Sequence, residues 1–528
     1  MTILESLGLL KMDFLGLRNL TVIHDAQQEI RKRLPQFRIK EIPEDDPAVF
    51  RMLSKGDSLG VFQLESDGIR RVLMQMQPTC MADITAVISL YRPGPMDSIP
   101  QYLKCRSNPS KVRYDHPMLE PILKETFGCI VYQEQVMEIC RSLAGYSYGR
   151  ADLVRRAMAK KKHQVMEQER EIFIHGNESC CGAVKNGVPE AVANTIFDRM
   201  AAFASYAFNK SHAAAYARIA YETAYLKCRY FSEYLSALMT SVLSNTSKLL
   251  EYIAVCEAHG TAVLRPDINT SDMGFTAAPE GIRFGLLAIR GLGTNVIRSL
   301  LDERAENGKY KSLQDFCERN GGGEVGKRAV ENLIRAGAFD GLGWNRRQML
   351  DGCEQLLAAA STRSRTMVSG QLSLFGEMEE EAIPVMQPPE LPEYPEQILL
   401  KMEKELTGLY LSGHPLGGWS IYRKLLRMPE TADLSMIRDG TPVRMLCLVG
   451  EVRRHMTRRG EDMCFFTAED LSGTMDCIAF QQAYRTCHPY LKEDAGVCLT
   501  GRISRKDQSL SLICEDVLPE KRFGELFA

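Results

Sequence analysis

The sequence has almost no net charge, because its 65 lysines and arginines nearly balance its 67 aspartates and glutamates. The whole chain therefore offers no general attraction to a polyanion, and any binding to nucleic acid must come from local basic patches. The sequence also lacks an apolar run of the ~18 residues that span a bilayer, and no hydrophobic segment of a signal peptide opens it. These absences exclude a membrane-spanning protein and predict a cytoplasmic one.

The sequence also lacks the cysteine spacing that is typical of zinc sites. The 16 cysteines are scattered without a Cys-x-x-Cys pair, and the adjacent Cys180 and Cys181 have a poor geometry for zinc. We therefore predict reduced, mostly structural thiols, as in a cytosolic protein. The 528 residues, 45% hydrophobic and 25% charged, are typical of a globular protein. This length predicts about three to five domains.

Residues 203–216 form the first stretch with chemical interest. Asn209, Lys210, Ser211 and His212 stand where an alanine-rich helix should begin. A helix N-terminus presents free backbone N–H groups and the positive end of the helix dipole, to which a polyanion can bind. The alternative is an ordinary capped helix with solvated polar residues, since serine and asparagine are common at helix N-termini.

A second basic cluster follows a glycine-rich turn at residues 145–149. Positions 152, 155, 156, 159 and 160 recur at three- and four-residue spacing, so much of the charge of Arg155, Arg156 and Lys160 projects from one helical face. We expect no compensating carboxylates near the two clusters, so together they predict a phosphate-binding concavity. A solvated charged face is the alternative.

Five motifs support a more specific hypothesis. They are GVFQLES at 60–66, LYRPGP at 90–95, VYQEQVM at 131–137, RRAM at 155–158 and FNKSHAAAY at 208–216. In order and spacing they resemble the bacterial replicative DNA polymerase III alpha subunit. The resemblance covers nearly the whole chain but only the C-terminal half or so of the family's length. It implies a multidomain, mainly α-helical protein with a C-terminal all-β barrel of the OB type.

The same resemblance implies addition of deoxynucleotides from dNTPs to a primer 3′-OH, with Mg²⁺ as cofactor. Residues 7–17 read as a buried strand, and in the family this segment closes the palm, here residues 1–38. Carried over, Asp13 would be a catalytic, metal-binding carboxylate, and Lys11 would lie beside the triphosphate. One carboxylate cannot hold two Mg²⁺ ions. Because only twelve residues precede Asp13, we expect the family's other two catalytic acids to be missing and this chain alone to be inactive.

Residues 39–245 would form the fingers. In this interpretation the residues that bind the triphosphate are Arg92, Arg155, Arg156, Lys160, Lys210 and His212. Tyr206 would stack near the nascent base pair. Their role would be positioning and charge neutralisation, the main source of rate in phosphoryl transfer. Residues 127–136 read as a strand that runs into a helix, with Glu134 structural.

Residues 246–358 would form a helix-hairpin-helix domain that binds duplex DNA. Gly291 and Gly293 precede a charged helix, and such a hairpin presents backbone N–H groups to a DNA phosphate without reading sequence. Residues 328–340 look like a second unit of this kind. The alternative is a glycine C-cap between packed helices.

Residues 359–396 are polar and rich in glutamate and proline, which predicts a flexible linker. The residues that resemble the family's sliding-clamp-binding motif lie within it: Gln371, Leu372, Ser373, Leu374 and Phe375. Apolar anchors in a mobile segment are typical of docking peptides, although a short local strand is the alternative. The partners implied are primer-template DNA, dNTPs, the sliding clamp and other replisome subunits, with no membrane.

After a connecting helix and turn at 397–435, five short alternating runs predict a Greek-key barrel of the OB type at 436–528. The residues that would suit a single-stranded template are Arg453, Arg454, Arg458, Arg459, Phe465 and Phe466. A purely structural barrel is the alternative.

Two rival hypotheses concern the whole chain. One is a non-catalytic DNA- and sliding-clamp-binding module, and the other is a helical scaffold protein without salt-sensitive DNA binding. A reading frame that extends past Met1 and contains an Asp-x-Asp strand would favour the polymerase. A natural start at Met1 would favour the module.

Overall fold

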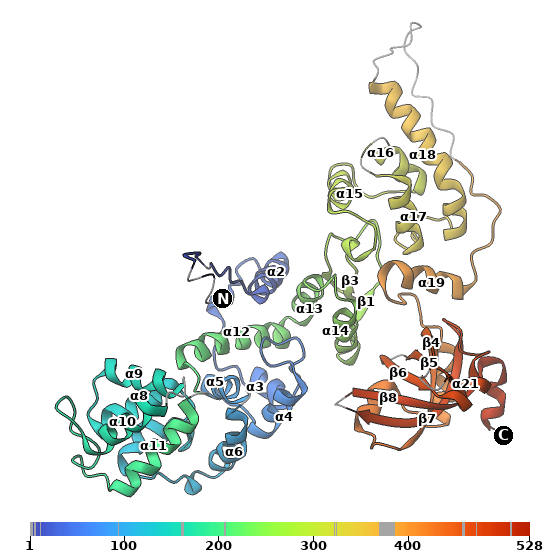
Figure 1. The fold of residues 1–528 in the computed structure, drawn as a ribbon. Helices are drawn as coiled ribbons and strands as arrows, with labels where there is room; N and C mark the ends of the chain where they lie inside the picture. Colours follow the sequence, from blue (N-terminus) through green and yellow to red (C-terminus); the bar gives the residue numbers. More distant parts are fainter. Residues whose placement is uncertain are drawn as a thin grey trace. The chain divides into compact units, whose positions relative to one another are not determined.

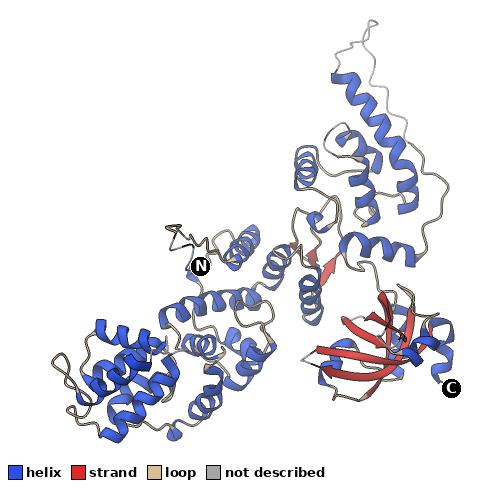
Figure 2. Ribbon diagram, in the orientation of Figure 1, coloured by secondary structure: helices blue, strands red, loops and turns tan. Residues whose placement is uncertain are grey.

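The computed structural model describes the chain apart from residues 1–3, 5, 6, 11, 93, 160–162, 205, 206, 322, 324, 369–385, 457–459, 471, 507, 508 and 528. The chain divides into two compact units, Met1–Ser241 and Val242–Ala528 (Figure 1). Helices build the first unit, and the strands lie in the second (Figure 2). No helix in the described ranges is both long and apolar enough to cross a membrane.

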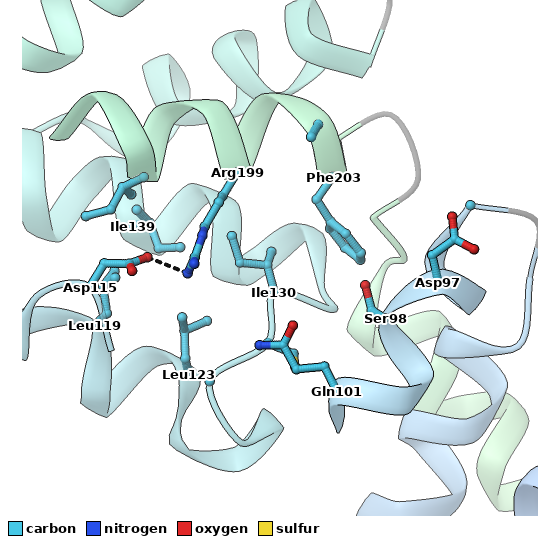
Figure 3. Close-up of a pocket in the computed structure, with 15 residues that line it drawn as sticks. Asp97, Ser98, Gln101, Asp115, Leu119, Leu123, Ile130, Ile139, Arg199 and Phe203 are labelled. Carbon is cyan, nitrogen blue, oxygen red and sulfur yellow. Dashed lines mark hydrogen bonds and ion pairs between the residues drawn. The ribbon is translucent and has the colours of Figure 1, made fainter. Parts of the chain in front are cut away.

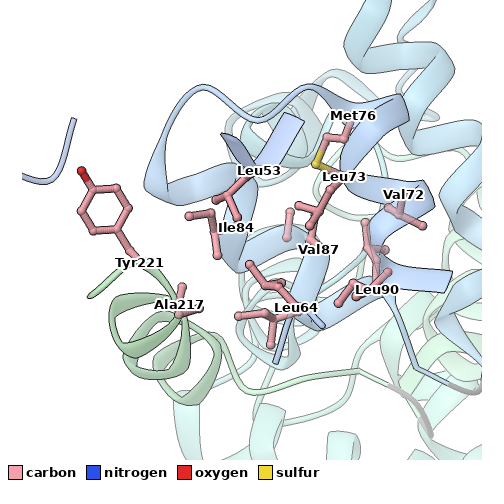
Figure 4. Packing of buried hydrophobic residues seen from close by; sticks show 14 of the residues in the cluster. Leu53, Leu64, Val72, Leu73, Met76, Ile84, Val87, Leu90, Ala217 and Tyr221 are labelled. Carbon is pink, nitrogen blue, oxygen red and sulfur yellow. The ribbon is translucent and has the colours of Figure 1, made fainter. Parts of the chain in front are cut away.

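The regular secondary structure described in the first unit is helical. Its helices are α2 (Arg18–Arg33), α3 (Pro47–Ser54), α4 (Asp67–Met76), α5 (Met81–Leu90), α6 (Ile99–Ser107), α7 (Glu120–Leu123), α8 (Gln133–Ala144), α9 (Tyr148–Ala159), α10 (His163–His175), α11 (Glu190–Ala204), α12 (Lys210–Arg229) and α13 (Phe231–Thr240). The short 3-10 helices η2 (Pro95–Ser98) and η5 (Lys124–Thr126) lie between them. Two hydrophobic cores stabilise the unit. One includes Leu73 and Val87 beside Tyr221 of α12 (Figure 4), and the other is built around Phe173 and Phe197.

Helix α12 confirms the prediction made from its alanines. Asn209 is its N-cap, and the side chain accepts a hydrogen bond from the His212 N–H at 2.8 Å. Ala213, Ala217 and Ala220 are fully buried. Because these small residues recur every three or four positions, they let α12 pack closely along α5.

The prediction of a buried strand at residues 7–17 is wrong. Residues 12–17 have no regular secondary structure, and Met12, Phe14 and Leu15 are 69%, 93% and 94% exposed. A strand needs a neighbour for its backbone hydrogen bonds, and the described part of the first unit contains no strand. An apolar run without such a neighbour does not form a sheet.

The prediction of a strand before α8 is also wrong. Residues 127–131 contain no strand, and Tyr132 forms only an isolated parallel bridge with Phe208. The predicted helix is confirmed as α8, whose third residue, Gln135, contributes to a capping box. The bridge is short, but it fixes the start of α8 beside the start of α12.

The motif at 60–66 is tied to α12 and α13. The Phe62 N–H donates to Thr223 Oγ1 at 3.1 Å, and the Tyr234 hydroxyl donates to the Gly60 carbonyl at 2.7 Å. The Lys227 side chain has no exposed surface, and its ammonium donates to Asp57 Oδ1 at 2.6 Å. A buried ammonium needs such a partner, since an unpaired buried charge is strongly destabilising.

Acid is expected to weaken the first unit through Asp83. Arg106 donates to both carboxylate oxygens at 3.0 and 2.7 Å, and the Thr79 N–H donates at 2.8 Å. Burial raises the pKa of Asp83, but these hydrogen bonds outweigh it and hold the pKa below its ordinary value of 3.8. A lowered folded-state pKa gives stability that is present above the unfolded-state value and is lost as the pH falls through the folded-state value.

We expect Asp83→Asn to lower the free energy of unfolding by about 1.5–3 kcal/mol at neutral pH. The difference from wild type should shrink as the pH falls below the ordinary value of 3.8, since the wild-type carboxylate is then protonated too. Thermal unfolding of both proteins across this pH range measures the difference. A difference that does not change with pH would contradict the assignment.

The second unit begins with α14 (Thr246–Ala258) and a small sheet. The sheet contains β1 (Ala262–Leu264), β2 (Thr276–Ala278) and a central β3 (Gly281–Arg283), which is parallel to β1 and antiparallel to β2. Four helices follow: α15 (Thr294–Asn307), α16 (Leu313–Asn320), α17 (Lys327–Arg335) and α18 (Arg346–Val368). Both α16 and α17 pack against α18.

The linker prediction is wrong at both ends. Helix α18 continues to Val368, past the expected linker start at residue 359. Residues 386–395 are held against α18, because Asn345 Nδ2 donates to the Leu391 carbonyl and Gln348 Nε2 to the Pro389 carbonyl, each at 2.9 Å. The predicted clamp-binding residues 371–375 lie outside the described residues.

Helices α19 (Glu396–Thr407) and α20 (Ser420–Leu425) lead to a closed five-stranded barrel. Its strands are β4 (Pro442–Met456), β5 (Asp462–Glu469), β6 (Thr474–Ala479), β7 (Gly496–Lys506) and β8 (Ser509–Pro519), with α21 (Gln481–Cys487) before β7. The strand order is β4-β5-β6-β8-β7, and β7 closes the barrel on β4. Among the described residues of the barrel, only β6 and β8 pair in parallel. This arrangement confirms the predicted OB barrel.

Candidate functional site

The starts of α8 and α12 are joined by their backbones. The Gln133 N–H donates to the Phe208 carbonyl at 2.9 Å, and the Phe208 N–H donates to the Val131 carbonyl at 3.3 Å. The Gln133 side chain adds a bond to the Ala207 carbonyl at 2.9 Å. We call this place, where Tyr132 and Phe208 also form a bridge, the α8–α12 junction. It holds two sequence motifs, at 131–137 and 208–216, in fixed relation.

Carboxylates occupy the positive end of α12. Lys210 Nζ lies 2.8 Å from both oxygens of Glu125, and the Lys210 N–H donates to Glu134 Oε2 at 2.9 Å. The Asn209 side-chain amide donates to Glu134 Oε1 at 3.0 Å. Glu134 therefore has the structural role predicted for it. The expectation that the basic clusters lack compensating carboxylates is wrong here, because Glu125 lies 85 positions away in the sequence and is brought in by the fold.

A series of contacts between aromatic side chains extends from the same junction. The Arg92 guanidinium lies over the Phe208 ring at 4.4 Å, and Phe208 contacts His212 with ring centroids 5.4 Å apart. His212 continues to Tyr216 at 4.2 Å, and Tyr216 to Phe62 at 5.2 Å. Cation–π and ring contacts thus fix Arg92 and His212 in place. The structure brings together three predicted residues, Arg92, Lys210 and His212.

Tyr132 lies beneath this cluster. Its ring centre is 5.4 Å from Lys210 Nζ, and the residue is 3% exposed. Burial raises the pKa of Tyr132, and the nearby Glu125 and Glu134 carboxylates raise it further. The phenol therefore stays protonated at neutral pH and adds no negative charge to the site.

The α9 arginines form a separate cluster. Arg155 donates to Asp152 Oδ1 at 3.0 and 2.7 Å, and Arg156 Nε lies 2.8 Å from Asp152 Oδ2. The Arg155 hydrogen bond lowers the pKa of Asp152 most, despite the opposing effect of burial. A compensating carboxylate, Asp152, therefore lies one helical turn from both arginines, so the expectation that this cluster lacks one is also wrong. The Arg155 side chain is 16% exposed and that of Arg156 64%, so only Arg156 presents most of its surface to solvent.

Several predicted residues have a more limited structural account. Lys11, Lys160 and Tyr206 lie outside the described residues, and Asp13 is in an exposed segment without regular structure. Where the chain is described, no group of three or more histidines, cysteines, aspartates and glutamates could hold a metal ion. Asp13 alone does not fit a pair of Mg²⁺ ions, which need several hard oxygen ligands. All 16 cysteines are free thiols, most of them buried, as predicted.

A cavity of about 440 Å³ lies near the junction, between η2, α6 and α11 (Figure 3). Leu123, Ile130 and Phe203 give it an apolar wall. An ion pair between Arg199 and Asp115 crosses one side (Figure 3). Because Asp97 and Asp115 line the cavity and Arg199 is the one cation among its lining residues, it suits a triphosphate less well than the junction that holds Arg92, Lys210 and His212. Sequence reasoning missed it, since no local motif marks it.

Gly291 and Gly293 form the predicted hairpin turn. Gly291 has φ +82°, and a Cβ there would lie 2.6 Å from the Asn332 amide nitrogen. Gly293 is the N-cap of α15, and a Cβ there would meet nothing within 4 Å. Gly326 caps α17 in the same open manner. Two exposed, glycine-capped helix starts are what a pair of such hairpins requires.

The barrel presents one of the two predicted aromatic residues. Phe465 is 42% exposed, whereas Phe466 is 2% exposed and packs in the barrel core. The prediction that both face a strand of nucleic acid is therefore wrong for Phe466. Arg453 stands opposite Phe465 in the β4–β5 register. Arg453 pairs with Glu451 at 2.6 Å and Arg454 with Asp462 at 2.9 Å, both as exposed ion pairs.

Three family models match the chain. Residues 19–180 match the bacterial DNA polymerase III alpha subunit finger domain, residues 260–349 a helix-hairpin-helix motif, and residues 446–520 an OB-fold nucleic acid binding domain. These matches agree with the helical first unit, the glycine-capped helices and the barrel.

Curated relatives match nearly the whole chain. It is 41% identical to the DNA polymerase III subunit alpha of Thermus aquaticus over 96% of its length. Identity is 38% to that of Borreliella burgdorferi and 40% to that of Neisseria meningitidis serogroup A, each over 99% of the chain. The chain spans 41%, 46% and 45% of these three relatives, less than half of each.

Proposed function

Because the chain belongs to the family of the bacterial DNA polymerase III alpha subunit, we propose that it supplies the fingers and DNA-binding domains of a replicative DNA polymerase. The full-length protein would add deoxynucleotides to a primer 3′-OH in the cytoplasm. One observation carries the proposal: Arg92, Lys210 and His212 converge at the α8–α12 junction. The junction is the proposed site for the triphosphate of the incoming dNTP.

Each junction residue has a distinct proposed role. Lys210 would neutralise phosphate charge, and His212 would donate from its ring at the first turn of α12. Phe208 holds Arg92 through its ring face, so the guanidinium would reach a phosphate oxygen with little loss of side-chain entropy. Such preorganised donors lower the barrier by positioning the triphosphate and stabilising its developing charge.

The α9 residues would act at the edge of the site. We assign a phosphate contact to Arg156, because its side chain is 64% exposed, and a positioning role to Arg155, which Asp152 holds. Lys160, Tyr206 and Lys11 stay proposals based on the family resemblance alone. Mg²⁺ would supply Lewis-acid charge to the phosphates, with Asp13 as one ligand, but the described residues do not complete a metal site.

DNA and protein partners are proposed from the second unit. The open helix starts at Gly293 and Gly326 would bind the phosphates of duplex primer-template DNA. Arg453, Arg454 and Phe465 would bind a single-stranded template through charge and stacking. The sliding clamp would bind residues 371–375, and other replisome subunits complete the set of partners.

Binding of primer-template DNA by this chain tests the proposal. We expect the logarithm of the binding constant to fall linearly with the logarithm of the salt concentration, because basic groups release counterions from the phosphates. Gly293→Ala should weaken duplex binding about threefold to tenfold with only a small fall in Tm from the poorer N-cap, since its Cβ enters open space but blocks close backbone approach. Gly418→Ala is the matched control, because its Cβ also meets nothing within 4 Å. Salt-independent binding, or equal effects of both variants, would contradict this assignment.

A further inference from the structure

Glu125 is paired with Lys210, whose ammonium is the proposed phosphate-binding group of the fingers. Both of its carboxylate oxygens lie 2.8 Å from Lys210 Nζ, so the pair is bidentate. The two side chains are 48% and 43% exposed. A triphosphate that binds Lys210 competes with this carboxylate, because the two oxygens of Glu125 already engage the ammonium, which has only three N–H donors.

The backbone that carries Glu125 is held rigidly. Thr126 Oγ1 donates to the Cys129 carbonyl at 2.6 Å, and Gln135 Nε2 donates to Thr126 Oγ1 at 2.8 Å. Gln135 also donates to the Ile122 carbonyl of α7 at 3.2 Å, so α8 holds the segment on both sides of Glu125. The fold therefore places the Glu125 carboxylate next to Lys210, and the ion pair does not depend on a chance contact between two mobile side chains.

Glu134, the second carboxylate at the junction, differs from Glu125 in its bonds. It accepts from the Lys210 backbone N–H and from the Asn209 side chain, which itself caps α12. Displacing Glu134 would leave the helix start without these bonds. Displacing Glu125 breaks only a half-exposed ion pair, the weakest kind of charge contact. A charge-assisted bond to a phosphate is stronger, so a nucleotide would displace the Glu125 carboxylate from Lys210.

We propose that Glu125 is an intramolecular counter-anion that holds Lys210 in the empty state and competes with polyphosphates for it. This inference rests on the proposed function of the α8–α12 junction. The competition weakens the binding of every polyphosphate, including the pyrophosphate product. Return of the Glu125 carboxylate to Lys210 then favours product release. Glu125 acts through Lys210 and is a positioning residue, not a catalytic one.

The test is equilibrium binding of a fluorescent deoxynucleoside triphosphate and of inorganic tripolyphosphate to the full 528-residue chain. At fixed ionic strength, Glu125→Gln should lower the Kd of both probes about twofold to fivefold. Glu138→Gln is the matched control, since it removes the same charge from a partly exposed pair with Arg141 on α8. The Glu125→Gln effect should shrink in a Lys210→Met background, because the competition needs the ammonium.

The outcomes separate the two claims. Unchanged or weaker binding by Glu125→Gln, or an equal gain for Glu138→Gln, overturns the inference while Lys210→Met still weakens binding. A Glu125→Gln effect of the same size in the Lys210→Met background also overturns it, since it would reflect general repulsion. Equal binding by wild type and Lys210→Met, or no binding by any variant, contradicts the proposed function of the junction itself.

Discussion

Replacing Glu403 by alanine is expected to lower the free energy of unfolding by about 3–5 kcal/mol, as for loss of one partner from a buried ion pair. Glu403 lies on α19 without exposed surface, and it accepts from Arg346 Nη2 at 2.8 Å. Its other oxygen accepts from the backbone N–H groups of Leu411 and Ser412 at 2.9 and 2.8 Å. The mutation removes all these bonds at once, and the 4% exposed Arg346 side chain loses one of its carboxylate partners while it keeps Asp340.

Calorimetry of the full chain measures this effect. The transition of the second unit should move down by at least about 6 °C, given 2–4 °C per kcal/mol for a unit of this size. Glu405→Ala is the control on the same helix, because Glu405 is 48% exposed and its pair with Arg335 contributes at most about 1 kcal/mol. Similar shifts for both variants would show that the buried network does not stabilise the unit.

Lys210→Ala should have the largest effect on the proposed reaction. In the proposed full-length polymerase, we expect the KM for dNTPs to rise about tenfold or more. A charge-assisted hydrogen bond to phosphate contributes about 1.5–3 kcal/mol, and each 1.4 kcal/mol is a factor of ten. Because the lysine would bind phosphate in the ground state too, kcat should fall less than kcat/KM.

Steady-state primer extension provides this measurement. Lys210→Arg should recover most of the loss, since arginine keeps the charge. Lys185→Ala, at an exposed loop position of the same unit, controls for a change in net charge. If Lys210→Ala left both KM and kcat unchanged, the assignment of Lys210 to the triphosphate would be wrong.

Local patterns predicted the helices and the barrel well. Asn209 followed by an alanine-rich run specifies α12 through capping and propensity alone. Alternation of apolar residues likewise predicted the five barrel strands, since inward and outward positions differ along each strand. Alternation also placed Phe465 and Phe466 on opposite faces, so the sequence contained the signal that only one of them is exposed.

Other features had a signal that was misread. Asp152 precedes Arg155 and Arg156 by three and four residues, the spacing at which helical side chains pair. Counting the basic residues alone concealed this compensation. The run at 7–17 shows the opposite error, because apolar composition does not reveal whether a partner strand is present.

The remaining features of the fold and the candidate site depend on contacts between residues that are distant in the sequence. Glu125 meets Lys210 across 85 residues, and Arg346 meets Glu403 across 57. No local periodicity encodes such pairs, since they arise from how the helices pack. The family resemblance located the residues of the candidate site, but only the structure showed which of them are already paired.

Labelling with an acyl-phosphate derivative of a deoxynucleotide tests the central claim most directly. A lysine amine next to the bound phosphates attacks the acyl carbonyl and expels the phosphate, so peptide mass spectrometry identifies the neighbouring lysine. Placement of the triphosphate at the α8–α12 junction predicts labelling of Lys210 that unlabelled dNTP suppresses, with Lys185 labelled only in the background. Suppressible labelling of other lysines, with Lys210 unlabelled, would contradict it.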